Sequence, residues 1–259
     1  GNVLVRPQTI WPTTRLDVVF EYLGANTRKL KNRALVRLHT GTTEIMTRIV
    51  LLDTDELSPG DQSFAQLILS EEDVAVAGDH FVLRSYSPVT TIGGGVILDP
   101  LPVKHKRKNR KILDDFNILQ NGELPEKISV LLERAGFAGM SIRMLAFRLG
   151  ISAKKIRESL EKLFSSRMAV LMGGDDFTAL SFQCYTQLEE RMLQSMTEYH
   201  SKNPLKEGMP REELKAALHT SVTPKLFNMA LLGLCKRQAI ISDKDYVRIF
   251  SHSVQLAGE

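Results

Sequence analysis

The chain has 259 residues, more than one average domain, so two or three domains are expected. Hydrophobic residues make up 43% and charged residues 25%, as is ordinary for globular proteins, and no apolar run approaches the roughly 20 residues that span a bilayer. The N-terminus has no basic segment followed by an apolar stretch. The sequence therefore predicts no signal peptide and a cytoplasmic protein.

Two cysteines, Cys184 and Cys235, are too few for a disulfide scaffold and are not spaced as metal ligands. Both stand among apolar residues, so we predict two buried thiols and no metal site.

The net charge of +4 is unevenly distributed. Residues 1–103 carry 9 basic and 12 acidic side chains, whereas residues 112–259 carry 19 and 18. Residues 104–111 carry six basic side chains and no acid. The basic character of the chain therefore lies almost wholly in one short stretch.

The first 103 residues read as a β domain. Short apolar runs alternate with turn residues every 8 to 12 positions, which predicts an all-β barrel or sandwich. The expected strands are Leu16–Tyr22, Ala34–Leu38, Glu44–Leu52, Ser63–Leu69, His80–Arg84 and Gly95–Leu98. Two prolines, Pro100 and Pro102, then precede the basic stretch and predict a linker at 104–111.

The remainder reads as helical and contains a repeat with an offset of about 70 residues. Leu145 and Leu149 match Leu214 and Leu218, and each pair precedes a short turn, a second helix and a two-stranded hairpin. This order is typical of α+β winged-helix modules, which we place at 112–181 and 182–256. The expected helices are 124–135, 141–149, 153–167, 186–201, 210–218 and 223–237.

Residues at helical spacing in the second helix of each repeat are predicted to be core. They are Leu160, Leu163, Phe164, Leu226, Met229 and Leu232. Ser152 and Thr223 suit helix N-caps, and Pro224 suits a first helical turn.

No motif for catalysis or nucleotide binding is present. The sequence has no phosphate-binding loop, no metalloprotease motif and no organised triad, so we predict no catalytic residue, no metal and no cofactor in this chain. Gly93-Gly94-Gly95 lacks dinucleotide-binding spacing and is expected between two strands, at a bend or a close packing contact. His39, at a strand end, is expected to be structural or to contact RNA.

Several strings in the β domain resemble the third domain of translation GTPases of the elongation factor Tu superfamily. They are Arg33–Thr42, Leu57–Gly60, Ala65–Leu67, Ala77–Arg84 and Thr90–Pro100. Ser85–Pro88 running into the triple glycine, then Lys104–Arg107, is similar to one branch, the bacterial selenocysteine-specific elongation factors. Winged helices after the barrel strengthen this resemblance.

The resemblance implies a factor that carries selenocysteyl-tRNA to the ribosome at a recoded UGA codon, guided by an mRNA hairpin. Such a factor has a GTPase domain, two barrels and four winged helices, and it uses GTP and Mg²⁺. The sequence departs from this pattern because it shows neither a GTPase domain nor a second barrel and has only two winged helices. We therefore expect a fragment that does not hydrolyse GTP, is monomeric, and meets the mRNA hairpin only through other modules.

The resemblance also implies tRNA contacts near one rim of the barrel. Hydroxyls, backbone amides and an arginine suit phosphates and 2′-hydroxyls of an A-form stem. The candidates are Arg33, His39, Thr40, Gly41, Thr42, Ser87, Thr90 and Thr91. The alternative for residues 40–42 is a plain turn between strands.

Basic residues supply a second set of candidates for RNA or the ribosome. They are Lys104, Lys106, Arg107, Lys108, Arg110, Lys111, Lys154, Lys155 and Arg157. The alternative for the linker is a solvated segment, or one that lies against the acidic barrel. Because residues 112–259 are nearly neutral, the winged helices are predicted to act largely as a spacer.

Two other functions remain open from the sequence. One is a tandem winged-helix transcription regulator with a ligand-sensing β domain, which the weakly basic recognition helices disfavour. The other is a structural protein–protein module.

Overall fold

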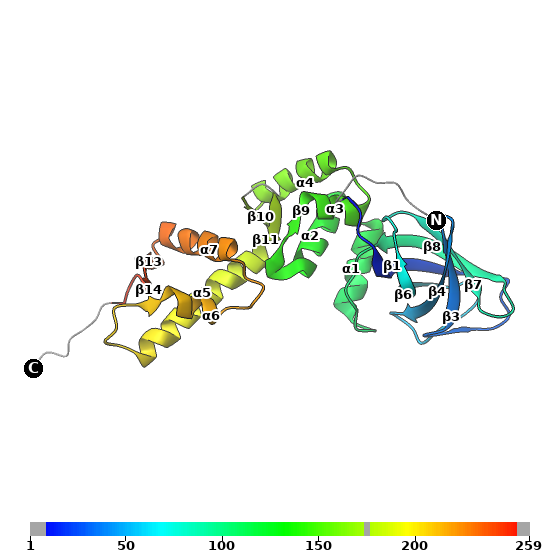
Figure 1. Cartoon of the computed structure of the whole chain (residues 1–259), viewed down its shortest axis with the longest axis horizontal. Coiled ribbons are helices and arrows are strands. Elements are labelled where there is room, and N and C mark those ends of the chain that lie inside the picture. The colour runs from blue at the N-terminus through cyan, green and yellow to red at the C-terminus, as the bar shows by residue number, and fades with distance from the viewer. Residues whose placement is uncertain (1–8, 174–176, 253–259) are drawn as a thin grey trace, which may run out of the picture. The chain divides into compact units, whose positions relative to one another are not determined.

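The computed structural model describes residues 9–173 and 177–252 (Figure 1). The chain divides into two compact units, one made of residues 1–130 and 142–159 and the other of 131–141 and 160–259. Among the described residues, no helix is both long and apolar enough to cross a membrane.

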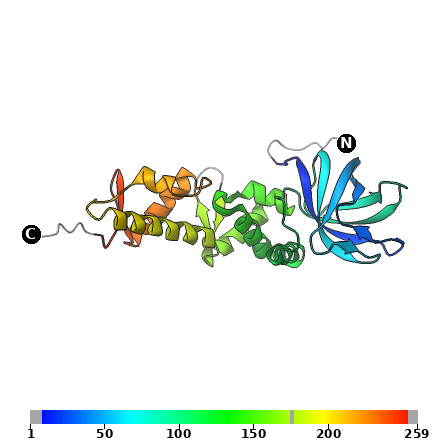
Figure 2. The same cartoon turned by 90° about the horizontal axis from the view of Figure 1, so that it is seen from below.

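The first unit contains a closed antiparallel barrel (Figure 2). Its strand order is β1-β6-β4-β3-β7-β8. Its strands are β1 (Thr13–Tyr22), β3 (Leu35–Thr40), β4 (Thr43–Leu51), β6 (Gln62–Asp73), β7 (His80–Ser85) and β8 (Thr91–Asp99). All six predicted runs fall within these strands or differ by a residue at an end, which confirms the barrel. Two short strands, β2 (Leu30–Lys31) and β5 (Glu56–Leu57), form a separate ribbon that the sequence did not predict.

Alternate residues of the strands fill the barrel, as the two-residue period of a strand requires. Leu16, Val18 and Phe20 of β1 are fully buried together with Leu38 and Leu83 of two other strands.

The triple glycine lies inside β8 and not between two strands, so that part of the prediction is wrong, although close packing is confirmed. Phe20 of β1 lies opposite Gly95. A Cβ on Gly95 would lie 1.8 Å from the carbonyl oxygen of Val19, and one on Gly93 would lie 2.2 Å from that of Glu21. Glycine is required because β1 crosses β8 too closely for any side chain.

The end of the basic stretch opens a helix, α1 (Arg110–Asn121), which the sequence did not predict separately. The Asn109 side chain caps it by accepting from the backbone N–H of Ile112. Phe116 of α1 is fully buried against Val50 and Leu98 of the barrel, so this helix packs on the barrel although the prediction gave it to a winged helix.

A buried polar network joins the segment after β8 to the barrel. His105 Nε2 lies 2.6 Å from Asp17 Oδ2, and Gln66 donates to Asp17 Oδ1 (2.8 Å) and to the Val103 carbonyl (2.9 Å). Burial raises the pKa of the Asp17 carboxyl, while the His105 hydrogen bond opposes that rise. The charged form of Asp17 therefore depends on its partners.

The helix α3 (Ile142–Leu149) is also fixed to the barrel within this unit. The Arg148 guanidinium makes a two-pronged ion pair with Asp99, whose side chain is fully buried. The Trp11 and Phe147 rings lie 5.1 Å apart. Trp11 is the only tryptophan of the chain, so its fluorescence can report unfolding of this unit.

The two predicted repeats share one element order. The first runs α2 (Leu124–Ala135), β9 (Met140–Ser141), α3, α4 (Ala153–Ser165), β10 (Ala169–Met172), β11 (Thr178–Ser181). The second runs α5 (Phe182–Lys202), β12 (Met209–Pro210), α6 (Arg211–Ala216), α7 (Pro224–Lys236), β13 (Ile240–Ser242), β14 (Tyr246–Ile249). Each ends in a small antiparallel sheet, β10-β11-β9 or β12-β14-β13. The tandem winged-helix prediction is confirmed. Residues 174–176, between β10 and β11, lie outside the described residues.

The second repeat, α5 to β14, is called here the second winged helix. Its core joins Met192 and Met196 of α5 to Leu226 and Leu231 of α7. The Thr223 side chain caps α7 by accepting from the N–H of Leu226, as predicted (3.2 Å).

Three predictions about burial need correction. Leu232 is 62% exposed, because Phe227, Ala230 and Leu234 take the inward face of α7. Phe164 and Met229 are only half-buried. Cys184 and Cys235 are likewise half-buried thiols and not fully buried ones.

A stacked histidine pair lies at the far end of α5. The His200 and His252 rings are 3.8 Å apart, and the backbone N–H of Ile249 donates to His200 Nε2 at 3.4 Å. Burial lowers the pKa of His200, helped by the nearby His252 and Arg248 charges.

This pair predicts acid sensitivity of the second winged helix. Because the folded pKa lies below the unfolded value near 6.5, the unfolded chain binds more protons, and stability falls as pH drops from 6.5 through the folded pKa. We expect His200→Gln, which keeps an acceptor for Ile249, to flatten the fall in melting temperature between pH 7.5 and 5.5. His219→Gln, at an exposed histidine, is the control and should keep the wild-type slope. An unchanged slope in His200→Gln would contradict the assignment.

Candidate nucleic-acid interface

The strand register separates the predicted tRNA-binding residues into two groups. In the β3–β7 pair, Val36 lies opposite Ser85 and His39 lies opposite Val82. The β7–β8 loop therefore lies beside the start of β3, and the β3–β4 turn lies at its other end. These ends are roughly 20 Å apart at 3.3 Å per residue. The prediction of one rim containing all eight residues is therefore wrong.

The group at the end of β3 is a tight hairpin. Thr40 pairs with Thr43, and Gly41 and Thr42 make the turn, with Gly41 at φ +54°. Thr40 is almost buried, and His39 Nε2 lies 3.6 Å from Glu44. The alternative of a plain turn accounts for this geometry, and RNA contact by these residues stays a prediction.

The other group joins the β7–β8 loop to Arg33. The Ser85 hydroxyl organises the loop through the N–H of Thr90 (3.1 Å) and the Thr90 hydroxyl (2.9 Å). Ser87, Thr90 and Thr91 are exposed around it. At the start of β3, Arg33 adopts φ +66°, and its carbonyl accepts from Arg48 at 3.5 Å.

Three arginines on the outer face of the barrel were missed as candidates. Arg37 lies directly opposite Arg84, and Arg48 lies opposite Leu35 on the neighbouring strand. Like charges directly opposite on one face destabilise a sheet, so this face favours an anion. The two-residue period of the strand places Leu35, Arg37 and His39 on the same outer face, and this pattern could have identified Arg37 as a surface candidate.

One acid partly offsets this charge. Glu44 pairs with Arg37, and that hydrogen bond holds the pKa of Glu44 below its usual value. The Arg37 guanidinium also lies 5.7 Å from the centre of the exposed Tyr86 ring, which connects the arginine face to the β7–β8 loop.

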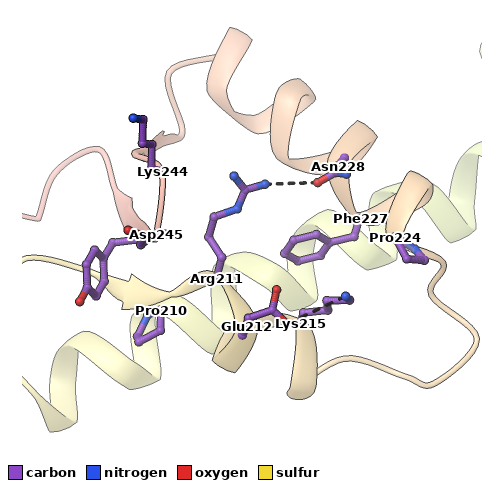
Figure 3. Close-up of a pocket in the computed structure, with 10 residues that line it drawn as sticks. Pro210, Arg211, Glu212, Lys215, Pro224, Phe227, Asn228, Lys244 and Asp245 are labelled. Atoms are coloured by element: carbon purple, nitrogen blue, oxygen red, sulfur yellow. Dashed lines mark hydrogen bonds and ion pairs between the residues drawn. The ribbon is translucent and has the colours of Figure 1, made fainter.

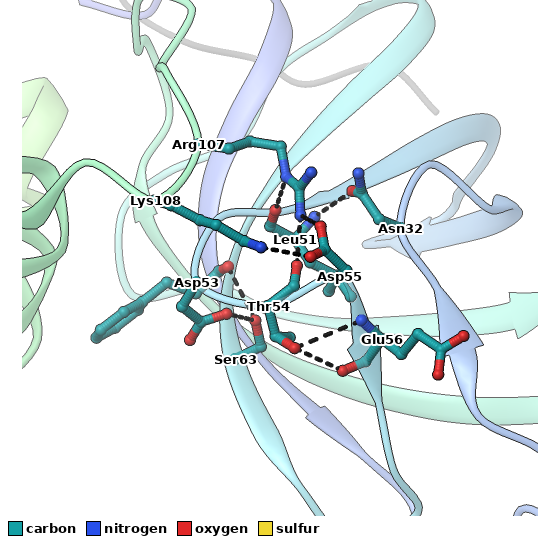
Figure 4. A network of polar contacts seen from close by, with 10 residues as sticks. Asn32, Leu51, Asp53, Thr54, Asp55, Glu56, Ser63, Arg107 and Lys108 are labelled. Atoms are coloured by element: carbon teal, nitrogen blue, oxygen red, sulfur yellow. Dashed lines mark hydrogen bonds and ion pairs between the residues drawn. The ribbon is translucent and has the colours of Figure 1, made fainter.

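Part of the basic stretch lies on the barrel, as one of the two alternatives proposed. The Arg107 guanidinium donates to the carbonyls of Leu51 (2.7 Å) and Thr54 (2.6 Å) and pairs with Asp55 at 2.6 Å (Figure 4). Lys108 pairs with the same carboxylate, and these two cations lower the pKa of Asp55. Arg107 and Lys108 are therefore less available to RNA than the sequence implied.

The other basic candidates are on the surface. Lys104, Lys106, Arg110 and Lys111 are exposed along the stretch, and Lys154, Lys155 and Arg157 are exposed in the first turns of α4. Within residues 9–173 and 177–252, no group of three or more His, Cys, Asp or Glu could hold a metal ion.

Comparison with known proteins gives two family matches in chain order. Residues 17–104 match "Selenocysteine-specific elongation factor, beta-barrel domain". Residues 193–249 match "Elongation factor SelB, winged helix", the model of the second winged-helix domain in that factor. Together they cover more than half of the chain.

A curated relative and a solved structure agree with these matches. The chain is 29% identical, over all 259 residues, to a selenocysteine-specific elongation factor from Desulfomicrobium baculatum and spans 41% of its length. The crystal structure of the bacterial factor EF-Sec superposes on 95% of the chain, with 15% identity and a TM-score of 0.63, over 35% of its own length. The domain matches, their order and the full-length alignment show that the chain belongs to the family of selenocysteine-specific elongation factors.

Proposed function

We propose that this chain is the part of its factor that grips selenocysteyl-tRNA through the barrel and links it, through the winged helices, to modules that hold the mRNA hairpin on the ribosome. The observation that carries the proposal is the arginine face of a barrel of this family, Arg37, Arg48 and Arg84, next to an exposed hydroxyl-rich loop. We propose that the chain performs this function in the cytoplasm, and we assign no catalytic step, cofactor or metal to the chain itself.

The β7–β8 end is the better docking site for a tRNA stem. Guanidinium groups bind phosphates in two-pronged geometry, and the Ser87, Thr90 and Thr91 hydroxyls can reach 2′-hydroxyls of an A-form minor groove. The hairpin end offers fewer exposed donors, because Thr40 is buried and His39 faces Glu44.

Binding of fluorescent selenocysteyl-tRNA to the whole chain tests this choice. We expect Arg48→Ala/Arg84→Ala to weaken binding about tenfold at 100 mM salt and to make the logarithmic salt slope shallower by one to two, because two phosphate contacts are lost.

The control Lys29→Ala/Lys31→Ala removes the same charge from the β2 ribbon and should change binding less than twofold. If both double variants lost tRNA affinity equally, the binding would depend only on the overall charge of the chain and not on the arginine face. A loss confined to Thr42→Ala would move the site to the β3–β4 hairpin. Tighter, sequence-selective binding to duplex DNA would favour the transcription-regulator alternative.

A further inference from the structure

A cleft of about 480 Å³ in the second winged helix, between the start of α6 and the start of α7, has polar groups that do not face one point. Arg211 Nη2 donates to Asn228 Oδ1 at 3.2 Å, but Lys215 and Lys244 lie at opposite ends (Figure 3). By contrast, charged groups beside α3, in the first unit, converge on one buried pair of carboxylates.

Asp17 of β1 and Asp99 of β8 form this pair. They lie directly opposite each other in the barrel, and both side chains are fully buried. Like charges at opposite positions destabilise a sheet, and a buried carboxylate is stable only with a partner. Burial raises the pKa of the Asp17 carboxyl, and the charge of Asp99 adds to that rise. The pair therefore needs positive groups from outside these two strands.

Two segments supply such groups. From the segment after β8, His105 Nε2 lies 2.6 Å from Asp17 Oδ2. From α3, Arg148 Nε donates to Asp99 Oδ1 at 2.9 Å, and Arg148 Nη2 donates to Asp99 Oδ2. The Arg148 side chain is only 11% exposed. Because arginine is always charged and its two-pronged contact fixes a geometry, Arg148 can orient α3 as well as neutralise Asp99.

Two other contacts hold α3 at the same place on the barrel. The Trp11 ring, just before β1, lies 5.1 Å from the ring of Phe147, the neighbour of Arg148. Gly150, directly after α3, has a φ of +64°, and a Cβ there would lie 2.3 Å from the Ala77 carbonyl oxygen in the β6–β7 turn. The α3 end therefore rests on the barrel at three points, and the Arg148 contact is the directional one.

We propose that Arg148 is a positioning residue, which docks α3 on the barrel in one orientation through the buried carboxylate pair. The winged-helix arm then starts from a fixed point on the domain that grips tRNA. The sequence predicted a spacer, whereas this contact makes the beginning of the arm a rigid extension of the barrel. The inference rests on the proposed function, a link between tRNA and the modules that hold the mRNA hairpin.

Distance measurement between two spin labels tests the docking in the whole chain. Nitroxides are attached at Thr27→Cys, in the loop after β1, and at Glu158→Cys, on α4, both exposed positions, with Cys184 and Cys235 changed to serine. We expect one narrow distance distribution in the parent chain and a distribution about twice as wide in Arg148→Gln. Arg148→Lys keeps the charge without the two-pronged geometry, so its width should be intermediate.

Trp11 reports the same change without labels. Quenching of its fluorescence by acrylamide should rise about twofold in Arg148→Gln, because the Phe147 ring no longer covers it. Asp99→Asn/Arg148→Met removes both charges and so leaves no buried carboxylate without its cation. This double variant should show the same wide distribution, and it carries the test if Arg148→Gln does not fold.

Two controls separate positioning from a general loss of charge or stability. Lys154→Gln removes one positive charge from an exposed position at the start of α4 and should keep the parent width. His105→Ala removes the other cation of the network and destabilises the barrel, but it leaves the Arg148–Asp99 contact in place, so its distribution should stay narrow.

Parent width and parent quenching in the Arg148 variants would overturn the proposal. Equal broadening in His105→Ala would also overturn it, because α3 would then loosen with any loss of barrel stability. Arg48→Ala/Arg84→Ala should keep the narrow distribution whether or not it weakens tRNA binding, so the docking of α3 and the tRNA-binding role of the arginine face fail separately.

Discussion

Gly95→Ala is expected to destabilise the barrel by about 3 kcal/mol or more, at or above the upper end of usual overpacking costs. The added Cβ would lie 1.8 Å from the Val19 carbonyl oxygen and 3.2 Å from Phe20 Cα. Both neighbours are backbone atoms of a central strand, so no rotamer change relieves the clash, and β1 must move away from β8. Urea unfolding followed by Trp11 fluorescence measures the loss.

Gly24→Ala is the matched control in the same unit. The added Cβ would lie 4.0 Å from its nearest neighbour, an ordinary contact. The free energy of unfolding of Gly24→Ala should therefore lie within about 0.5 kcal/mol of the wild-type value. If Gly95→Ala unfolded at the wild-type midpoint, the close crossing of β1 and β8 would be wrong.

Local patterns were sufficient to predict the barrel and both winged helices. The two-residue alternation of β1 and β3 and the repeated leucines at 145, 149, 214 and 218 depend only on each segment needing one buried face. Where a segment had two possible partners, such patterns failed. Ile112, Phe116 and Leu119 have helical spacing, but only the fold shows that α1 covers the barrel.

The candidate sites were harder to predict because they depend on register and on convergence. Arg33 and His39 stand six positions apart in a matching string, yet the strand pairing places them toward opposite ends of β3. Arg211 and Asn228 are 17 positions apart, and their hydrogen bond forms only because the fold brings the start of α6 beside α7. The strand predicted at Ala34–Leu38 already separates Arg33 from His39, whereas no local pattern brings residues 211 and 228 together.

His105→Ala is expected to cost about 3 kcal/mol, the upper end for leaving a buried polar group without its main hydrogen-bond partner, although Gln66 still donates to Asp17. The imidazole is almost fully buried, 2.6 Å from a carboxylate whose pKa burial already raises. Removing it leaves the buried Asp17 carboxyl with one hydrogen-bond partner fewer and a space beside Phe116, whose ring centre lies 5.6 Å from that of His105.

A double-mutant cycle separates these two losses. If the charge interaction dominates, His105→Ala should cost only about 1 kcal/mol when Asp17→Asn is already present, giving a coupling of about 2 kcal/mol. If the space beside Phe116 dominates, the cost should be the same in both backgrounds. Lys106→Ala, at the exposed neighbour, should change stability by less than about 0.5 kcal/mol. A coupling near zero would mean that His105 holds the segment after β8 on the barrel by packing alone. The hydrogen bonds of Asp17 to its other partners would then be sufficient to keep it buried.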